Sequence, residues 1–274
     1  MYQRFSNRLI INAELITVTS LHIGAGQGSF KPSTVKAPLL KDAFGQPYIP
    51  GSSIKGVLRS FLESLDLNNA KSCYMGERCS KPFENGTLRK EHINKIKKIS
   101  HGNIDAYAAE DMAAKACMAC RLFGSKVMAG KVKISDAVLN SDHILKTEIR
   151  TGNAIDRDTH TAAGSALFDI ETIPSGTNFI LRIVGENLTK KESIIFSKLI
   201  QYFGEGELLL GGHHRSGLGQ ICLQNVHIDI AKRQVGEFPE HKKVVIEDIT
   251  DIAAIIEELM GDAYANEPEV RITC

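Results

Sequence analysis

The chain has 274 residues, 43% hydrophobic and 24% charged, an ordinary globular composition that suffices for one large domain or two small ones. Its 33 basic and 32 acidic residues leave a formal charge of +1, which excludes an overall attraction for nucleic acid, so any phosphate contact must come from a local patch. No apolar run reaches the roughly 18 residues of a membrane span. Because the first residues also lack the apolar segment of a signal peptide, we expect a cytoplasmic protein that contacts no membrane.

The first predicted elements are a strand and a helix. Residues 9–23 are rich in Ile, Leu, Val and Thr and end at closely spaced glycines, which predicts a strand that runs into a flexible loop. A turn at residues 47–51 then delivers Ser52 as the cap of a helix. The apolar residues that recur at helical spacing after it are Ile54, Val57, Leu58, Phe61, Leu62 and Leu65.

The middle of the chain contains two interruptions of the core pattern. Residues 68–116 are polar and locally basic, with too few apolar positions to form a core, so we interpret them as an insertion. Strand-like stretches at residues 127–139 and 166–184 flank a glycine- and threonine-rich segment, residues 151–164. This segment is predicted to be an exposed arm or hairpin that contacts partners.

The last third of the chain predicts a helix at residues 193–203, a glycine-dense loop at 204–219 and a strand at 221–230. An amphipathic helix from Thr250 and a short tail follow. This order predicts an α+β fold with helices on one face of a sheet, most simply a ferredoxin-like core with insertions. The expected parts are a core at about 9–66 and 121–232, an insertion at about 68–120, an arm at about 151–165, and a C-terminal helix and tail at 240–274.

The helix start at residues 49–59 has the features of a phosphate-binding site. Backbone N–H groups at a helix start favour anions, and two hydroxyls and two cations lie nearby. Lys55 and Arg59 are four residues apart on one side of the helix, so both are expected to reach one backbone strand of RNA. The plainer interpretation is a capped helix with a solvated basic face.

Residues 211–219 form a second candidate site, Gly-Gly-His-His-Arg-Ser-Gly-Leu-Gly. Its glycines allow a ligand to approach the backbone, Arg215 offers a bidentate donor to phosphate, and His213 and His214 are possible acid–base groups. A tight turn between a helix and a strand is the plainer interpretation. The helix-then-strand order does not fit a dinucleotide-binding motif.

Four of the six cysteines occur as two pairs, which favours a metal site over disulfides in a reducing compartment. Cys73, Cys79, Cys117 and Cys120 suffice for a closed, structural zinc site that would stabilise the insertion. His92 or His101 is an alternative to one cysteine. Buried thiols that bind no metal are the other interpretation of the second pair.

Five segments, taken in order, resemble the RAMP superfamily of CRISPR proteins. They are Leu-His-Ile-Gly-Ala-Gly at 21–26, Pro-Tyr-Ile-Pro-Gly-Ser-Ser-Ile-Lys-Gly at 47–56, Cys-Arg-Leu-Phe-Gly-Ser at 120–125, Ala-Ile-Asp-Arg at 154–157 and the glycine loop at 211–219. Within that superfamily the chain is most similar to the backbone subunit of type III effector complexes. The resemblance spans residues 9–230 and implies a single domain over residues 1–274.

The resemblance implies an RRM-like core that binds guide RNA, with the arm inserted between nucleotides of the guide–target duplex. The implied partners are guide RNA, complementary target RNA and sister subunits of the complex. The residues expected to contact RNA are His22, Gly24, Gly26, Lys36, Gly51, Ser52, Ser53, Lys55, Arg59, Ile155, Arg157, His213, His214 and Arg215.

Active members of the family cut target RNA with an aspartate two residues before a proline, and Lys36 occupies that position here. A lysine cannot act as the required carboxylate, so we expect a binding subunit without a catalytic residue, which needs Mg²⁺ only if it cuts. The nearest carboxylate, Asp42, is interpreted as a turn residue. The alternatives are a target-cleaving backbone subunit, a metal-independent guide-processing nuclease that uses His213 or His214, and a zinc-stabilised interaction module without RNA.

Overall fold

The computed structural model describes residues 5–25, 37–65, 83–84, 87–88, 116–126, 128–141, 144–155, 162–233, 238–246, 248–261 and 264. An antiparallel six-stranded sheet in the order β10–β9–β1–β8–β4, with β5 also paired to β8, forms its centre. The strands of this sheet are β1 (Asn7–Thr17), β4 (Val132–Ile134), β5 (Val138–Leu139), β8 (Asn178–Glu186), β9 (Ile221–Lys232) and β10 (Glu240–Ile246). The helices are α1 (Gly51–Ser64), α5 (Met118–Phe123), α6 (Lys190–Gly204) and α7 (Ile252–Met260).

The connectivity confirms the predicted ferredoxin-like core. Apart from α5, β5, the short strands of the insertion and the two strands of the arm, which are inserted between them, the core elements follow one another as β1, α1, β4, β8, α6 and β9, the β-α-β-β-α-β order of that fold. In the sheet, the last of these four strands lies beside the first, followed by the third and the second, and each neighbouring pair is antiparallel. β10 extends the sheet beyond β9.

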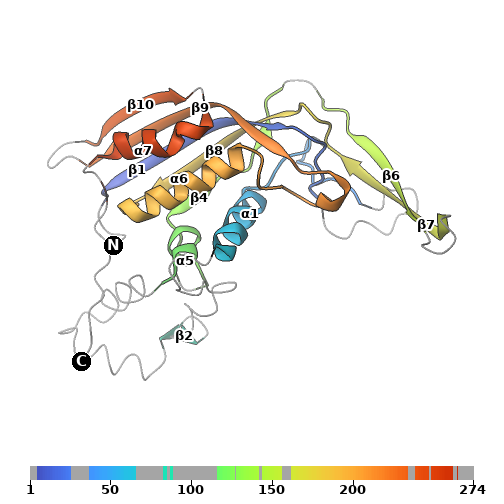
Figure 1. The fold of residues 1–274 in the computed structure, drawn as a ribbon, viewed down its shortest axis with the longest axis horizontal. Helices are drawn as coiled ribbons and strands as arrows, with labels where there is room; N and C mark the ends of the chain where they lie inside the picture. The colour runs from blue at the N-terminus through green and yellow to red at the C-terminus, as the bar shows by residue number, and fades with distance from the viewer. Residues whose placement is uncertain are drawn as a thin grey trace.

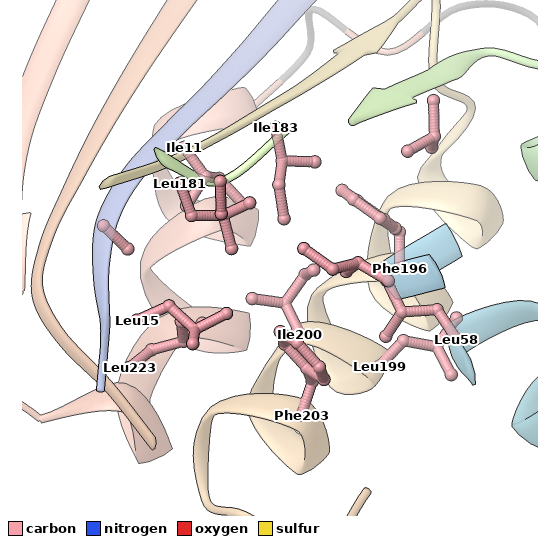
Figure 2. Packing of buried hydrophobic residues seen from close by; sticks show 14 of the residues in the cluster. Ile11, Leu15, Leu58, Leu181, Ile183, Phe196, Leu199, Ile200, Phe203 and Leu223 are labelled. Atoms are coloured by element: carbon pink, nitrogen blue, oxygen red, sulfur yellow. The ribbon is translucent and has the colours of Figure 1, made fainter. Parts of the chain in front are cut away.

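The hydrophobic core lies between the sheet and the helices on one of its faces (Figure 1). Along β1 the side chains alternate, with Leu9, Ile11, Ala13 and Leu15 buried, because successive residues of a strand point to opposite faces. Figure 2 shows how the sheet and helices interdigitate; its labelled side chains are Ile11 and Leu15 of β1, Leu58 of α1, Leu181 and Ile183 of β8, Phe196, Leu199, Ile200 and Phe203 of α6, and Leu223 of β9.

The predicted arm is an antiparallel hairpin of β6 (Glu148–Ile155) and β7 (Ala162–Thr172), which pair with each other in a separate sheet. In Figure 1 it projects beyond the end of the central sheet. The hairpin form is confirmed, but the arm is longer than expected at both ends. Its base continues the ladder to the pair Glu148–Thr172, where the strands are already close to the core.

The start of α1 differs from the prediction. The helix begins at Gly51 and its N-cap is Pro50, so Ser52 lies inside the first turn and is not the cap. Proline fits this position because its fixed φ is compatible with a helix start and it has no N–H to leave unpaired. The Gly51 N–H donates to Asp136 Oδ1 at 2.8 Å, so a residue from the loop after β4 takes the capping role.

The prediction was also wrong about the end of one strand and about the existence of another. β1 ends at Thr17, because the Val18 and Thr19 N–H groups both turn to the Gln220 carbonyl oxygen. Residues 240–246, predicted within a C-terminal helix and tail, form strand β10, and the helix α7 follows after the short 3-10 turn η4 (Ile249–Asp251). β10 buries only Ile246 among its side chains, so its sequence lacks the alternation that predicts a strand.

Only part of the predicted insertion is described, namely the two-stranded β2 (Phe83–Glu84) and β3 (Thr87–Leu88) and residues 116–120. Cys73, Cys79, His92 and His101 lie outside the described residues, as do Gly26, Lys36 and Arg157. None of the helices that the structure describes is long and apolar enough to cross a membrane.

Candidate nucleic-acid interface

His22 is at the centre of a cluster of loops and is only 6% exposed. Its Nδ1 lies 2.8 Å from the Glu171 carbonyl oxygen. Because a carbonyl only accepts hydrogen bonds, Nδ1 carries the proton and Nε2 points towards Gly24, where an added Cβ would lie 3.1 Å away. The ring meets that of His213 edge to face at 5.2 Å, and the His22 carbonyl accepts from the Gly212 N–H at 2.9 Å.

The glycine loop is built around His22 and leaves its polar side chains in solvent. Gly211 has a φ of 85°, and a Cβ there would lie 2.3 Å from the His22 carbonyl oxygen, so only glycine fits. His213 adopts a left-handed conformation and precedes the short 3-10 turn η3 (His214–Ser216). His213, His214 and Arg215 are exposed, so their side chains are accessible to a ligand.

Glu171, which was not among the predicted site residues, organises the base of the arm. Its carboxylate accepts hydrogen bonds from the Leu39 N–H at 3.0 Å, Lys41 Nζ at 2.6 Å and Thr147 Oγ1 at 2.6 Å. Burial alone would raise the pKa of this carboxyl, but the bonds from Lys41, Thr147 and Leu39 outweigh it and lower the pKa. Glu171 is therefore ionised at neutral pH.

Nearby, Asp42 is a turn residue, as predicted. Its Oδ1 accepts from the Phe44 and Gln46 N–H groups at 2.9 and 2.8 Å. The arm also contacts the loop after β1, because Arg150 donates to Ser20 Oγ at 2.9 Å. One connected surface region is therefore formed by four segments. They are the loop after β1, the segment of residues 37–41, the base of the arm, and the glycine loop.

The start of α1 forms a second candidate contact for phosphate. Gly51 packs so closely on the end of β4 that a Cβ there would lie 2.2 Å from the Ile134 carbonyl oxygen. Ser52 is exposed, and Ser53 and Lys55 are half-buried. Burial and the charge of Arg59 lower the pKa of Lys55. A bound phosphate would relieve this by supplying an opposite charge.

Arg59 does not accompany Lys55 to the surface as expected. Its Nη1 donates to the Gly124 carbonyl oxygen at 2.6 Å and its Nε to Glu63 Oε1 at 2.8 Å, and its Nη2 lies 3.6 Å from Cys120 Sγ. The guanidinium is thus used in the contact between α1 and α5. We therefore assign Arg59 to internal packing and keep Lys55 as the phosphate-binding candidate of this helix.

Two of the predicted zinc ligands are described. Cys117 is the N-cap of α5, and Cys120 lies in the first turn and is fully buried. No group of three or more His, Cys, Asp or Glu residues arranged for a metal occurs within the described part of the chain. Of the predicted arm contacts, Ile155 lies in β6, where its backbone pairs with Ala162 beyond a bulge.

Known proteins resemble this chain in sequence and in fold. The CRISPR system Cms endoribonuclease Csm3 of Methanocaldococcus jannaschii is 26% identical over 266 residues, which are 92% of this chain and 93% of that protein. The protein of the same name from Mycobacterium tuberculosis is 26% identical over 80% of this chain and 87% of its own length. The one from Methanothermobacter thermautotrophicus is 42% identical over 77 residues, 27% of this chain and 31% of its own length.

A solved structure shares the fold. A chain in the crystal structure of the Csm3–Csm4 subcomplex in the type III-A CRISPR-Cas interference complex superposes with a TM-score of 0.52 at 16% identity, covering 93% of this chain and 97% of that one. The sequence model of the RAMP superfamily matches residues 14–222, which include the end of β1, all of α1, the arm and the glycine loop. The chain belongs to the RAMP superfamily.

Proposed function

We propose that this chain is the guide-RNA-binding backbone subunit of a type III CRISPR ribonucleoprotein and that it does not itself cut RNA. The observation that carries the proposal is the likeness to a Csm3 protein over 92% of this chain and 93% of that one. The partners are guide RNA, complementary target RNA and the sister subunits of the complex. The sequence of the guide is read by base pairing, so the protein contacts need only hold the backbone.

The geometry supports phosphate contacts at two places. Arg215 is exposed on a loop whose backbone is fixed by glycines and by His22, and Lys55 lies in the first turns of α1. Such contacts position the protein on RNA without reading its sequence. The net charge of only +1 makes binding depend on these local cations.

Binding is tested with the chain purified together with its co-expressed guide RNA and sister subunits. We expect Lys55→Ala combined with Arg215→Ala to weaken guide binding at least tenfold and to reduce the slope of log affinity against log salt by about two, roughly one per lost phosphate contact. Lys198→Ala removes an exposed lysine from α6 and serves as the control. Guide binding by the double variant equal to that of the wild type would contradict the proposal.

The absence of cutting rests on Lys36, at the position where the resemblance places the aspartate of active members. With labelled complementary RNA and Mg²⁺, the wild-type complex should leave the target intact at this subunit's position, and Lys36→Asp should introduce a cut. The name endoribonuclease carried by the relatives favours a second candidate, target cleavage by another residue. Cutting by the wild type would establish that function instead.

A third candidate function is a guide-processing nuclease that uses the exposed His213 or His214. If the protein cuts guide precursor without metal, and His213→Ala or His214→Ala abolishes the cut, the chain is a guide-processing nuclease. If the purified protein carries no nucleic acid and its 260 nm absorbance is unchanged by nuclease or high salt, it is an interaction module without RNA. Either result replaces the proposed function.

We also propose a structural zinc ion held by Cys73, Cys79, Cys117 and Cys120. The position of the Arg59 guanidinium 3.6 Å from Cys120 Sγ supports it, because a nearby cation favours the thiolate that binds zinc. Elemental analysis should find zinc in the wild type and lose it on Cys117→Ser or Cys120→Ser. Cys222→Ser is the control, because Cys222 lies in β9, where burial raises the pKa of its thiol.

A further inference from the structure

Glu171 connects segments that are far apart in the sequence. Its carboxylate binds the Leu39 N–H, the Lys41 ammonium and the Thr147 hydroxyl, which belong to residues 37–41 and to the segment that leads into the arm. It is 8% exposed, so water competes little for these bonds. From its place on β7, this one side chain therefore holds together residues 37–41 and the residue that precedes β6.

The backbone of the same residue makes two further connections. The Glu171 N–H donates to the Ala37 carbonyl oxygen at 3.0 Å, and the Ala37 N–H donates to the Asp169 carbonyl oxygen at 3.3 Å, so Ala37 pairs with β7 on the side opposite β6. The Glu171 carbonyl oxygen orients His22 through Nδ1 at 2.8 Å. Through His22, Glu171 also reaches the glycine loop, since Gly212 binds the His22 carbonyl oxygen.

Glu171 lies at the base of the arm, so its bonds bear on the direction in which the arm points. β6 and β7 pair with each other outside the central sheet, and the arm projects from it (Figure 1). Its orientation therefore depends on the contacts at its base. Besides Glu171, these include the Arg150–Ser20 bond and the pairing of Leu21 with Ile173.

We propose that Glu171 is a positioning residue that locks the arm to residues 37–41 and to His22, and thereby sets the spacing along bound RNA between the loop contacts and the arm. This inference rests on the proposed function, because a spacing along RNA exists only if both regions touch RNA. Glu171 itself does not contact the RNA. It acts through the segments that it holds together.

The chemistry of the three donors distinguishes this role from that of a simple ion pair. An ionised carboxylate has lone pairs for several donors, and Glu171 uses them for one ammonium, one hydroxyl and one backbone N–H. A lysine in its place would accept none of these bonds. Exchanging the charges, with Lys41→Glu and Glu171→Lys together, would restore an ion pair but leave Leu39 and Thr147 without their acceptor.

The experiment compares the guide-bound full-length protein as wild type, Glu171→Gln, Glu171→Ala, Lys41→Met and the charge exchange. Nucleotides protected by the protein are mapped by chemical probing of the RNA backbone, and guide affinity is measured by titration. We expect both Glu171 variants and the charge exchange to lose the protection due to the arm. Affinity should stay within about threefold of wild type, because phosphate contacts elsewhere dominate it. Lys41→Met should give an intermediate pattern.

Glu186→Gln is the matched control. Glu186 is also a carboxylate on a strand with two basic partners, Arg8 and Lys133, but it lies at the end of β8 that pairs with the start of β1, opposite the end where β1 leads into its loop. It should keep the wild-type pattern. Glu171→Gln decides the result if Glu171→Ala does not fold, because it keeps the volume of the side chain and an acceptor for Leu39.

The outcomes separate this inference from the proposed function. If the wild type protects no RNA, the proposed function fails and the inference fails with it. If the wild type protects RNA and Glu171→Gln gives the same pattern, only the inference fails. Restoration of the arm's protection by the charge exchange would also overturn it, since a simple ion pair would then suffice.

Discussion

At the scale of single residues, the most consequential interaction is a buried carboxylate between two cations. Glu192 is fully buried, and its oxygens accept from Arg121 Nε at 2.7 Å and Lys131 Nζ at 2.6 Å. It also completes the capping box of α6 with Thr189. This group joins α5, the residue before β4 and the start of α6, so it fixes three elements of the core against each other.

Lys131→Met should therefore destabilise the fold by about 3–5 kcal/mol, the usual cost of removing one partner from a buried ion pair. Lys133→Met, two residues away, should cost less than about 1 kcal/mol, because exposed pairs contribute little. The side chain of Lys133 is 66% exposed in its pair with Glu186, against 1% for Lys131. Urea denaturation of both variants measures the difference, and equal losses would show that burial does not control this interaction.

The same scale shows where prediction from sequence stops. The family resemblance pointed to His22 and the local pattern pointed to the glycine loop, and the structure brings the two together. It did not identify Glu171, because its donors lie 24 to 132 positions away and only the folded chain assembles them. Arg59 was assigned by helical spacing alone, which cannot reveal that Gly124 and Glu63 would bind its guanidinium.

At the scale of elements, α1 depends on a glycine at its first position. Gly51→Ala should cost roughly 1–3 kcal/mol, the usual penalty for an overpacked contact, because its Cβ would overlap the Ile134 carbonyl oxygen and push the helix off β4. Gly56→Ala lies in the same helix with nothing within 4 Å of the added Cβ. It should stabilise the fold by about 0.5–1 kcal/mol through helix propensity.

Thermal or chemical unfolding distinguishes the two glycines. The prediction requires opposite signs for Gly51→Ala and Gly56→Ala. Two stabilising substitutions would mean that the helix start can shift without loss. Guide binding should fall for Gly51→Ala alone, because only that change displaces the start of the helix, which carries Lys55.

The arm should be separable from the core. Replacing residues 152–168 by Asn-Gly keeps the hairpin pairs from Glu148–Thr172 to Thr151–Asp169, and Asn-Gly suits a two-residue hairpin turn. Because β6 and β7 pair only with each other among the strands described, the free energy of unfolding should change by less than about 1 kcal/mol. Binding of the guide–target duplex should weaken at least tenfold. A large loss of stability would show that the distal arm supports the core.

The elements also show why the core of the fold was easier to predict from sequence than the edge strand of the sheet. The helical spacing of Ile54, Leu58 and Leu62 was confirmed as the buried face of α1, because periodicity is a local consequence of packing on a core. β10 lies at the sheet edge with one face exposed and only Ile246 buried, so its residues carry no such signal. Its pairing with β9 depends on backbone bonds that are independent of side-chain pattern.

At the scale of the whole molecule, pH should act on stability and on RNA binding in opposite directions. Hydrogen bonds and cationic partners lower the pKa of Glu171 and Glu186 below the ordinary value of 4.5. A carboxyl whose pKa is lower in the folded state stabilises the fold above its unfolded pKa, and this stabilisation is lost as pH falls through the folded pKa. Acidification below about pH 4.5 should therefore destabilise the fold.

Acid also neutralises carboxylates while the 33 lysines and arginines stay charged, so nonspecific affinity for RNA should rise as the fold weakens. Glu171→Gln removes one of the titrating groups and should make the loss of stability with acid less steep than in the wild type. Unfolding free energies between pH 7 and pH 3 measure this slope. An unchanged slope would mean that the ionised Glu171 carboxylate contributes nothing to holding the arm base together, and the arm would then owe its position to Arg150 and to the pairing of Leu21 with Ile173.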